Sequence, residues 1–296
     1  MNIQDIKVVS VLGGGTMGIG IAQVMAYKGF KVYLRDINTD LVKGALERIK
    51  KNLQKMVELK KITEPEVGEI MARIIGTTEI QAAVKDADFI VEAIPEKIEL
   101  KRETYKEVQK FCKADAILAS NTSTLSITEL AAVTDRPQKF IGMHFMNPVP
   151  QMSLVEIVTG LLSSTETIQI TKELTLKLGK EPIVIKDAPG FATTRLGVAL
   201  FLEASKMLEE GVASVDDIDK AMRIGYGHRM GPFETCDLVG LDARLNNINA
   251  LYESTRDLTW KPPQLLKKLV SAGFLGTKPA SKGGYYQYFG IIPAKK

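Results

Sequence analysis

The chain has 296 residues, of which 45% are hydrophobic, and its formal net charge at pH 7 is +4. This length allows one large domain or two ordinary ones, and the interleaved acidic and basic residues argue against a nucleic-acid-binding face. No apolar run is long enough to span a bilayer, so no membrane partner is expected. The N-terminus lacks a charged-then-apolar leader, and only two cysteines and two histidines are present. These features predict a cytoplasmic protein without a metal site.

The chain begins with a predicted strand, a glycine-rich turn and a helix in direct succession, over residues 7–12, 13–18 and 19–26. Gly13, Gly15 and Gly18 match the spacing G-x-G-x-x-G. The first glycine permits a tight turn, the second lets the backbone approach a pyrophosphate, and the third lets the helix pack on the strand. This succession predicts a dinucleotide-binding site.

The second predicted strand, residues 31–35, decides which dinucleotide is expected. It ends at Asp36, close to the spacing at which a carboxylate bonds the ribose hydroxyls of the cofactor. A carboxylate there repels a 2′-phosphate and therefore favours NAD over NADP. Arg35 keeps NADP open as an alternative, because an arginine beside the ribose accepts that phosphate.

Further strands are predicted as far as residue 185, over residues 73–77, 88–92, 116–120, 139–143, 153–158 and 181–185. Apolar residues at helical spacing follow over residues 199–208, and Ser214 is expected to cap a helix over residues 215–224. The sequence therefore predicts an α/β domain of Rossmann type over residues 1–186, with a doubly wound, mostly parallel sheet. An all-helical domain is expected over residues 187–296.

His144 is the candidate catalytic base. The strands on either side of the turn at Asn147-Pro148-Val149-Pro150 form a predicted hairpin that brings Glu156 beside His144. A carboxylate that holds one imidazole nitrogen leaves the other to exchange a proton with a substrate. The alternative for a lone histidine is a structural role, and His228, which has no acidic partner at a telling spacing, is interpreted as structural.

Two polar segments have both a functional and a structural interpretation. Residues 119–125, Ala-Ser-Asn-Thr-Ser-Thr-Leu, lie at the end of a strand and would face the same crevice as His144, or would cap the helix that follows them. A lysine cluster would either form a solvated helix face or attract a polyanionic substrate. Its members are Lys50, Lys51, Lys55, Lys60 and Lys61.

The chain resembles the L-3-hydroxyacyl-CoA dehydrogenase family, and within it the bacterial 3-hydroxybutyryl-CoA dehydrogenases most. The matching blocks occur in order along nearly the whole chain: residues 13–18, 91–96, 119–123, 143–150, 154–156, 187–191, 230–234 and 239–242. The resemblance implies that the protein oxidises an L-3-hydroxyacyl-CoA to the 3-ketoacyl-CoA with NAD, or catalyses the reverse reduction. It also implies a homodimer.

The resemblance assigns roles to individual residues. His144 is the base, Glu156 orients it, Ser123 donates to the reacting oxygen, and Asn147 lies near the nicotinamide and the substrate. Other positions line the cofactor site: Gly13, Gly15, Thr16, Met17, Gly18, Asp36, Glu96, Lys101 and Lys278. Asn52 and Lys60 are the candidates for contact with the coenzyme A phosphates.

The sequence departs from the family pattern at two places. Thr194 occupies the position of an asparagine that usually contacts the substrate oxygen, and a threonine hydroxyl is shorter than an amide. The C-terminal segment at residues 276–286 holds two extra residues, so Lys282 competes with Lys278 for the cofactor role.

Two alternatives to an acyl-CoA dehydrogenase remain at this stage. The first is a dehydrogenase of a free hydroxy acid, as in the related gulonate and carnitine dehydrogenases. The second is a catalytically weakened dinucleotide-binding protein, of which Thr194 would be the mark. The lysine cluster argues against the first, and the retention of His144, Glu156 and Ser123 argues against the second.

Overall fold

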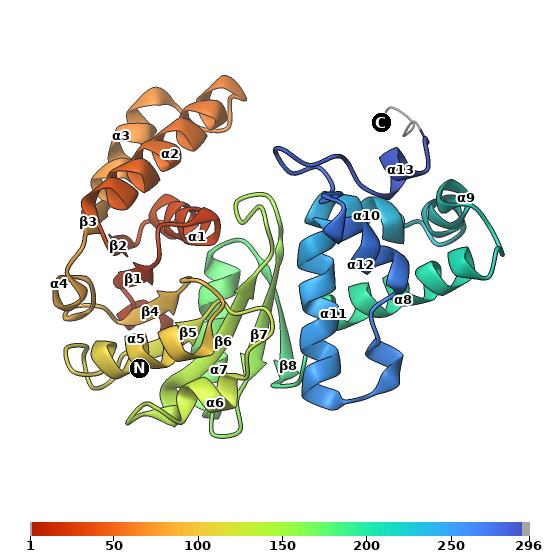
Figure 1. Ribbon diagram of the computed structural model, residues 1–296. Coiled ribbons are helices and arrows are strands. Elements are labelled where there is room, and N and C mark those ends of the chain that lie inside the picture. The colour runs from red at the N-terminus through yellow and green to blue at the C-terminus, as the bar shows by residue number, and fades with distance from the viewer. Residues whose placement is uncertain (1, 292–296) are drawn as a thin grey trace. The chain divides into compact units, whose positions relative to one another are not determined.

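The computed structural model describes residues 2–291 and divides into two compact units, Met1–Ala188 and Pro189–Lys296. The first unit is built on one eight-stranded sheet with the strand order β3-β2-β1-β4-β5-β6-β7-β8 (Figure 1). Neighbouring strands are parallel except for the antiparallel pair β6 and β7. The strands are β1 (Val8–Leu12), β2 (Lys31–Arg35), β3 (Ile74–Thr77), β4 (Phe89–Glu92), β5 (Ile117–Ser120), β6 (Phe140–Phe145), β7 (Leu154–Thr159) and β8 (Glu181–Lys186).

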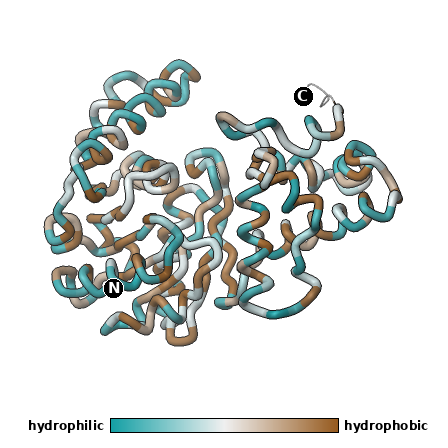
Figure 2. Tube along the Cα trace, viewed as in Figure 1, coloured by the Kyte–Doolittle hydropathy of each residue, from teal (hydrophilic) through white to brown (hydrophobic). Residues whose placement is uncertain are grey.

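Each predicted strand is therefore confirmed to within two residues at its ends, and so is the mostly parallel Rossmann-type sheet. Helices connect the strands of this unit: α1 (Thr16–Tyr27), α2 (Thr39–Glu58), α3 (Glu64–Ala72), α4 (Ile80–Val84), α5 (Ile98–Val108), α6 (Ile127–Ala131) and α7 (Thr165–Lys177), with 3-10 turns η1 (Ile3–Asp5) and η2 (Pro137–Lys139). Figure 2 shows hydrophilic residues along much of the hairpin formed by α2 and α3. Among the described residues, no helix is both long and apolar enough to cross a membrane.

Both faces of the sheet are buried: one carries apolar residues, and the second carries apolar residues such as Ile90 and Leu118 together with polar ones. On the first face, alternate strand residues from Val9 to Ile157 form one hydrophobic cluster with α1 and α7. Because successive side chains point to opposite faces, Glu92, Ser120 and His144 all point to the second face. All three are buried, so this face of the sheet holds a group of polar side chains in the protein interior.

The second unit is helical, as expected. It contains α8 (Thr193–Glu209), α9 (Val215–Lys220), η3 (Ala221–Gly225), α10 (Pro232–Val239), α11 (Leu241–Thr255), η4 (Leu258–Trp260), α12 (Gln264–Ser271) and α13 (Tyr285–Tyr288). Ser214 accepts a hydrogen bond from the backbone of Asp217, which confirms the predicted cap. The expectation of one regular helix over residues 215–224 is wrong, since η3 is a π-helical turn. His228 follows this turn and is exposed.

Candidate active site

His144 and Glu156 face each other across the antiparallel strands β6 and β7. The two residues are direct partners in the register, and the distance between His144 Nδ1 and Glu156 Oε2 is 2.6 Å. Glu156 is fully buried and His144 is 9% exposed. The predicted hairpin and its contact are thus confirmed. A carboxylate without access to water holds the imidazole ring in one orientation, which a general base requires.

The turn between His144 and Glu156 is held by a lysine that the sequence did not single out. The ammonium of Lys180 donates to the carbonyl oxygens of Val149 and Met152, at 2.6 Å each. Lys180 is 5% exposed, and burial lowers the pKa of its ammonium group. A lysine before a strand gives no sequence signal for such a role, because most lysines there are exposed. This clamp stabilises the segment that begins with Asn147, which is itself exposed.

The end of β5 supports the same segment from the other side. The side-chain oxygen of Asn121 accepts a hydrogen bond from the backbone N–H of Phe145, at 2.9 Å. Asn121 lies in the polar segment that the sequence placed at the carboxyl edge of the sheet. Its partner could not be predicted, because the contact depends on the pairing of β5 with β6.

Each glycine of the glycine-rich turn lacks a side chain for a different structural reason. Gly13 has a φ of +109°, and a β-carbon there would lie 2.5 Å from the carbonyl oxygen of Ala93. A β-carbon at Gly18 would lie 1.8 Å from the carbonyl oxygen of Gly13, so the helix could not approach the strand. At Gly15, by contrast, a β-carbon would meet no protein atom within 4 Å. Gly15 therefore borders open space, which fits a backbone that a pyrophosphate approaches.

A cleft of about 530 Å³ lies beside this turn and is lined by residues of the first unit alone. Gly13, Gly15, Thr16, Met17 and Asp36 are among its walls. Asp36 Oδ2 accepts a hydrogen bond of 2.6 Å from the backbone N–H of Gly14. The carboxylate is therefore fixed at the edge of the cleft, and the residues present fit an NAD molecule.

Arg35, which kept NADP open as an alternative, has a partner within the protein. Its Nε atom donates to the carbonyl oxygen of Thr78 at 3.1 Å. This bond directs part of the guanidinium toward the backbone, although Arg35 lines the cleft together with Asp36.

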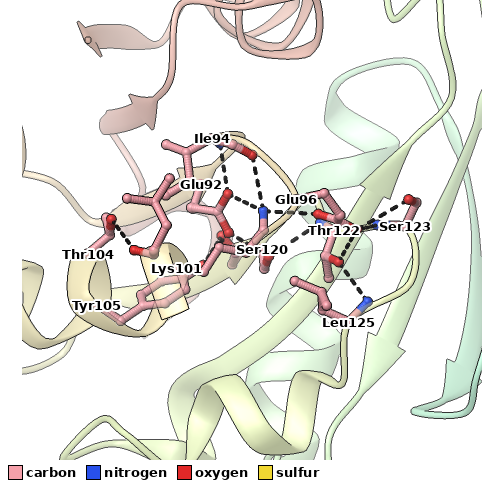
Figure 3. A network of polar contacts seen from close by, with 12 residues as sticks. Glu92, Ile94, Glu96, Lys101, Thr104, Tyr105, Ser120, Thr122, Ser123 and Leu125 are labelled. Carbon is pink, nitrogen blue, oxygen red and sulfur yellow. Dashed lines mark hydrogen bonds and ion pairs between the residues drawn. The ribbon is translucent and has the colours of Figure 1, made fainter. Parts of the chain in front are cut away.

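Glu96 and Lys101 belong to a polar network beneath the loop that carries Ser123 (Figure 3). One carboxylate oxygen of Glu96 accepts from the backbone N–H of Ser123 at 2.8 Å and from its hydroxyl at 3.3 Å. The other lies 3.3 Å from the ammonium of Lys101. The Lys101 side chain is 1% exposed, so the structure places it in the interior and away from solvent. Sequence reasoning did not predict this burial.

The two candidates for coenzyme A contact lie on or next to α2. Asn52 donates to Gln23 of α1 at 3.1 Å, so its amide takes part in a contact between helices. Lys60 follows the end of α2 and is exposed, as is the rest of the lysine cluster.

Three further candidates belong to the helical unit. Thr194 lies in the first turn of α8. The ammonium of Lys278 lies 2.6 Å from a carboxylate oxygen of Asp242. The side chain of Lys282 lies near Gly273.

Both units of the chain match models of known protein families. A family model described as "3-hydroxyacyl-CoA dehydrogenase, NAD binding domain" matches residues 8–188, and one described as "3-hydroxyacyl-CoA dehydrogenase, C-terminal domain" matches residues 190–288. The chain is 42% identical to a 3-hydroxybutyryl-CoA dehydrogenase of Bradyrhizobium diazoefficiens over 97% of each protein. It is 39% identical to the mitochondrial hydroxyacyl-coenzyme A dehydrogenase of Sus scrofa, over 96% of this chain and 91% of that protein.

A solved structure shows the same fold along the chain. The (S)-3-hydroxybutyryl-CoA dehydrogenase of Ralstonia eutropha is similar with a TM-score of 0.89 and 39% sequence identity, over 92% of this chain and 96% of that one. The glycine-rich turn, the cleft beside it and the His144–Glu156 pair thus occur in a chain that matches both domains of one enzyme family. The chain belongs to the 3-hydroxyacyl-CoA dehydrogenase family, an NAD-dependent family of oxidoreductases.

Proposed function

We propose that this protein interconverts short-chain L-3-hydroxyacyl-CoA and 3-ketoacyl-CoA, with 3-hydroxybutyryl-CoA as the expected substrate. The observation that carries the proposal is the 2.6 Å contact between His144 and Glu156, at the carboxyl end of β6 in an NAD-binding domain. Ligands of open α/β sheets bind at the carboxyl ends of the strands. A base at that edge is positioned for chemistry on a bound cofactor.

His144 acts as the general base in the oxidation. With Nδ1 bonded to Glu156, proton exchange with the substrate is assigned to Nε2, which takes the proton of the 3-hydroxyl group. Glu156 keeps the ring oriented and stabilises the imidazolium that forms. NAD, when bound, supplies the acceptor for the hydride that leaves carbon 3. In the reverse direction His144 returns the proton to the oxygen of the ketone.

Ser123, Asn147 and Thr194 complete the proposed catalytic set. Ser123 donates a hydrogen bond to the reacting oxygen, and Asn147 contacts the nicotinamide and substrate. Thr194 replaces the amide that the family usually provides, and a hydroxyl reaches less far. Loss of one such contact lowers the rate by roughly two orders of magnitude, unless the pocket accommodates a different acyl group.

NAD and the coenzyme A part of the substrate are assigned to different segments, the glycine-rich turn for NAD and the region of α2 for coenzyme A. Asp36 holds the ribose hydroxyls of NAD, and Lys278 of the helical unit is proposed to reach the cofactor. Asn52 and Lys60 are proposed to contact the coenzyme A phosphates. The exposed lysines around Lys60 support an anionic ligand.

The deciding experiment is a spectrophotometric assay of NADH oxidation with acetoacetyl-CoA, with longer 3-ketoacyl-CoAs and with free 3-keto acids, and of NAD reduction with free hydroxy acids. We expect the highest kcat/KM with acetoacetyl-CoA. A preference for a free acid would identify the protein as a hydroxy-acid dehydrogenase instead. Binding of NADH without turnover of any of these compounds would support the cofactor-binding alternative.

We further propose that the protein is a cytoplasmic homodimer formed through its helical unit. Leu196 and Leu200, one turn apart on α8, are 66% and 44% exposed. Exposed leucines on one helix face support a contact with another protein chain. Light scattering after size-exclusion chromatography tests the dimer, and the mass of a single chain would reject it.

A further inference from the structure

Behind the Ser123 loop, four side chains of the first unit form a fully buried polar cluster, Glu92, Lys101, Tyr105 and Ser120. Glu92 is at its centre, at the carboxyl end of β4 (Figure 3). Its Oε1 atom lies 2.5 Å from the ammonium of Lys101 and its Oε2 atom accepts from the hydroxyl of Ser120 at 2.7 Å. The connection from Glu92 to Ser123 runs through Lys101 and Glu96, so its influence on that residue is indirect.

Lys101 connects this buried cluster to Glu96. Its ammonium also lies 3.3 Å from Glu96 Oε2 and donates to the carbonyl oxygen of Ile94 at 3.3 Å. A lysine with three donors and three acceptors around it cannot turn away without leaving a buried charge uncompensated. Glu92 therefore fixes Lys101, and Lys101 fixes one oxygen of Glu96.

The second oxygen of Glu96 organises the loop after β5. It accepts hydrogen bonds from residues 122, 123 and 124, through the Thr122 hydroxyl at 2.5 Å and through the backbone N–H groups of Ser123 at 2.8 Å and Thr124 at 3.1 Å. Burial alone would raise the pKa of Glu96, but the charge of Lys101 and the bonds from Thr122 and Ser123 outweigh it and lower that pKa. Glu96 thus remains a charged acceptor at neutral pH.

The Ser123 hydroxyl can donate its hydrogen bond either to Glu96 or to the oxygen of a bound substrate. In this structure it donates to Glu96 at 3.3 Å, which is longer than the 2.8 Å bond that holds its backbone. The hydrogen bond from the backbone N–H keeps Ser123 in place, and the longer hydrogen bond from its hydroxyl is the weaker of the two. The Ser123 side chain can therefore rotate from the carboxylate of Glu96 to the oxygen of a substrate when one is bound.

We propose that Glu92 and Lys101 are positioning residues for the reaction, which act through Glu96 to place the Ser123 hydroxyl. The proposal rests on the proposed role of Ser123. It gives Lys101 a task other than lining the cofactor site, and it gives Glu92, which no sequence argument selected, a part in turnover. The predicted consequence is that changes in this cluster lower kcat, while KM for NADH changes little.

A double-mutant cycle in the whole 296-residue chain tests the proposal. Glu92→Gln and Glu96→Gln are each made alone and together with Ser123→Ala, and kcat is measured with acetoacetyl-CoA and NADH. We expect each glutamine variant to lose about tenfold in kcat alone, but less than twofold in the Ser123→Ala background, because the residue through which it acts is gone. A purely structural role would give the same loss in both backgrounds, and that result would overturn the proposal.

Two controls keep the outcome interpretable. Lys106→Met changes an exposed lysine on the same helix, α5, and should leave kcat unchanged. Should Glu92→Gln fail to fold, Glu96→Gln carries the test, since its side chain is 36% exposed. If Ser123→Ala alone leaves kcat unchanged, the assigned role of Ser123 is wrong and the proposal falls with it. Full activity of Ser123→Ala would still leave the His144 mechanism standing, so the two failures are distinguishable.

Discussion

Gly18 lies so close to Gly13 that a β-carbon at position 18 would stand 1.8 Å from the carbonyl oxygen of Gly13. Helix α1 can begin directly after β1 only because position 18 has no side chain. The same turn leaves Gly15 open to the cleft, with no protein atom within 4 Å of a β-carbon placed there. Gly18 is therefore required for folding, whereas Gly15 leaves room for the ligand.

Alanine at these two positions should separate stability from binding. Gly18→Ala would push the start of α1 away from the backbone of Gly13. It should lower the free energy of unfolding by more than about 4 kcal/mol or prevent folding. Gly15→Ala should fold with an unchanged melting temperature, since its backbone φ of −74° suits alanine, but weaken NADH binding by about tenfold, or about 1.4 kcal/mol. Thermal unfolding and a fluorescence titration with NADH measure the two effects. Normal NADH affinity in Gly15→Ala would argue against a pyrophosphate at that position.

Replacement of His144 by glutamine should remove the base without removing the cofactor site. We expect kcat to fall by about a thousandfold or more, because general base catalysis contributes about two to four orders of magnitude. NADH affinity should stay within twofold of the original, since His144 is not among the walls of the cleft beside the glycine-rich turn. Steady-state assays and NADH titration report both quantities, and unchanged turnover would eliminate the mechanism.

Glu156→Gln should have a smaller effect than the loss of His144. Glutamine has nearly the size of glutamate and still bonds the ring, but it carries no charge to stabilise the imidazolium formed during turnover. We expect a decrease in kcat of roughly ten- to a hundredfold. Circular dichroism and thermal unfolding must accompany the assay, because Glu156 is fully buried. A variant that folds normally and retains full activity would show that the pair has no catalytic function.

The helical unit should lose stability as the pH rises through the range of a buried carboxyl group. Asp237 accepts hydrogen bonds from the backbone of Tyr285 and Tyr286, yet burial raises its pKa to about 6. Since its pKa in the unfolded chain is lower, about 3.9, protonation favours the folded state. The contribution is complete below about pH 4 and is lost as the pH rises through about 6, with a total of about 3 kcal/mol.

Comparison of the original protein with Asp237→Asn isolates this contribution, because the other titrating groups cancel in the difference. Urea unfolding can be followed by the fluorescence of Trp260, the one tryptophan of the chain, which lies buried in the helical unit. The stability advantage of the original protein should shrink by up to about 3 kcal/mol between pH 4 and pH 7. A difference that does not vary with pH would mean that Asp237 titrates normally.

The strands of the first unit, the nucleotide-binding turn and the carboxylate partner of the candidate base could be predicted from the sequence alone. These features depend on short-range patterns: apolar runs bounded by turns, glycines at fixed spacing, and two strands joined by a proline-containing turn. The register that pairs His144 with Glu156 could be predicted because a hairpin constrains both strands through one short connection. The prediction of a regular helix as far as Ile224 was wrong, because a π-helical turn cannot be recognised from the spacing of apolar residues.

The burial of individual polar residues, and the side-chain contacts that hold the loops, became apparent from the three-dimensional fold alone. In the sequence Glu92 is an ordinary strand end and Lys180 resembles a surface residue before a strand, and the family resemblance assigned Lys101 to the cofactor site without indicating its burial. Each is buried because elements distant in the sequence meet around it: β4 with β5 and α5 around Glu92, and the turn after β6 with the start of β8 around Lys180. Burial of a charge depends on the acceptors that the fold assembles, and a linear pattern does not contain that information.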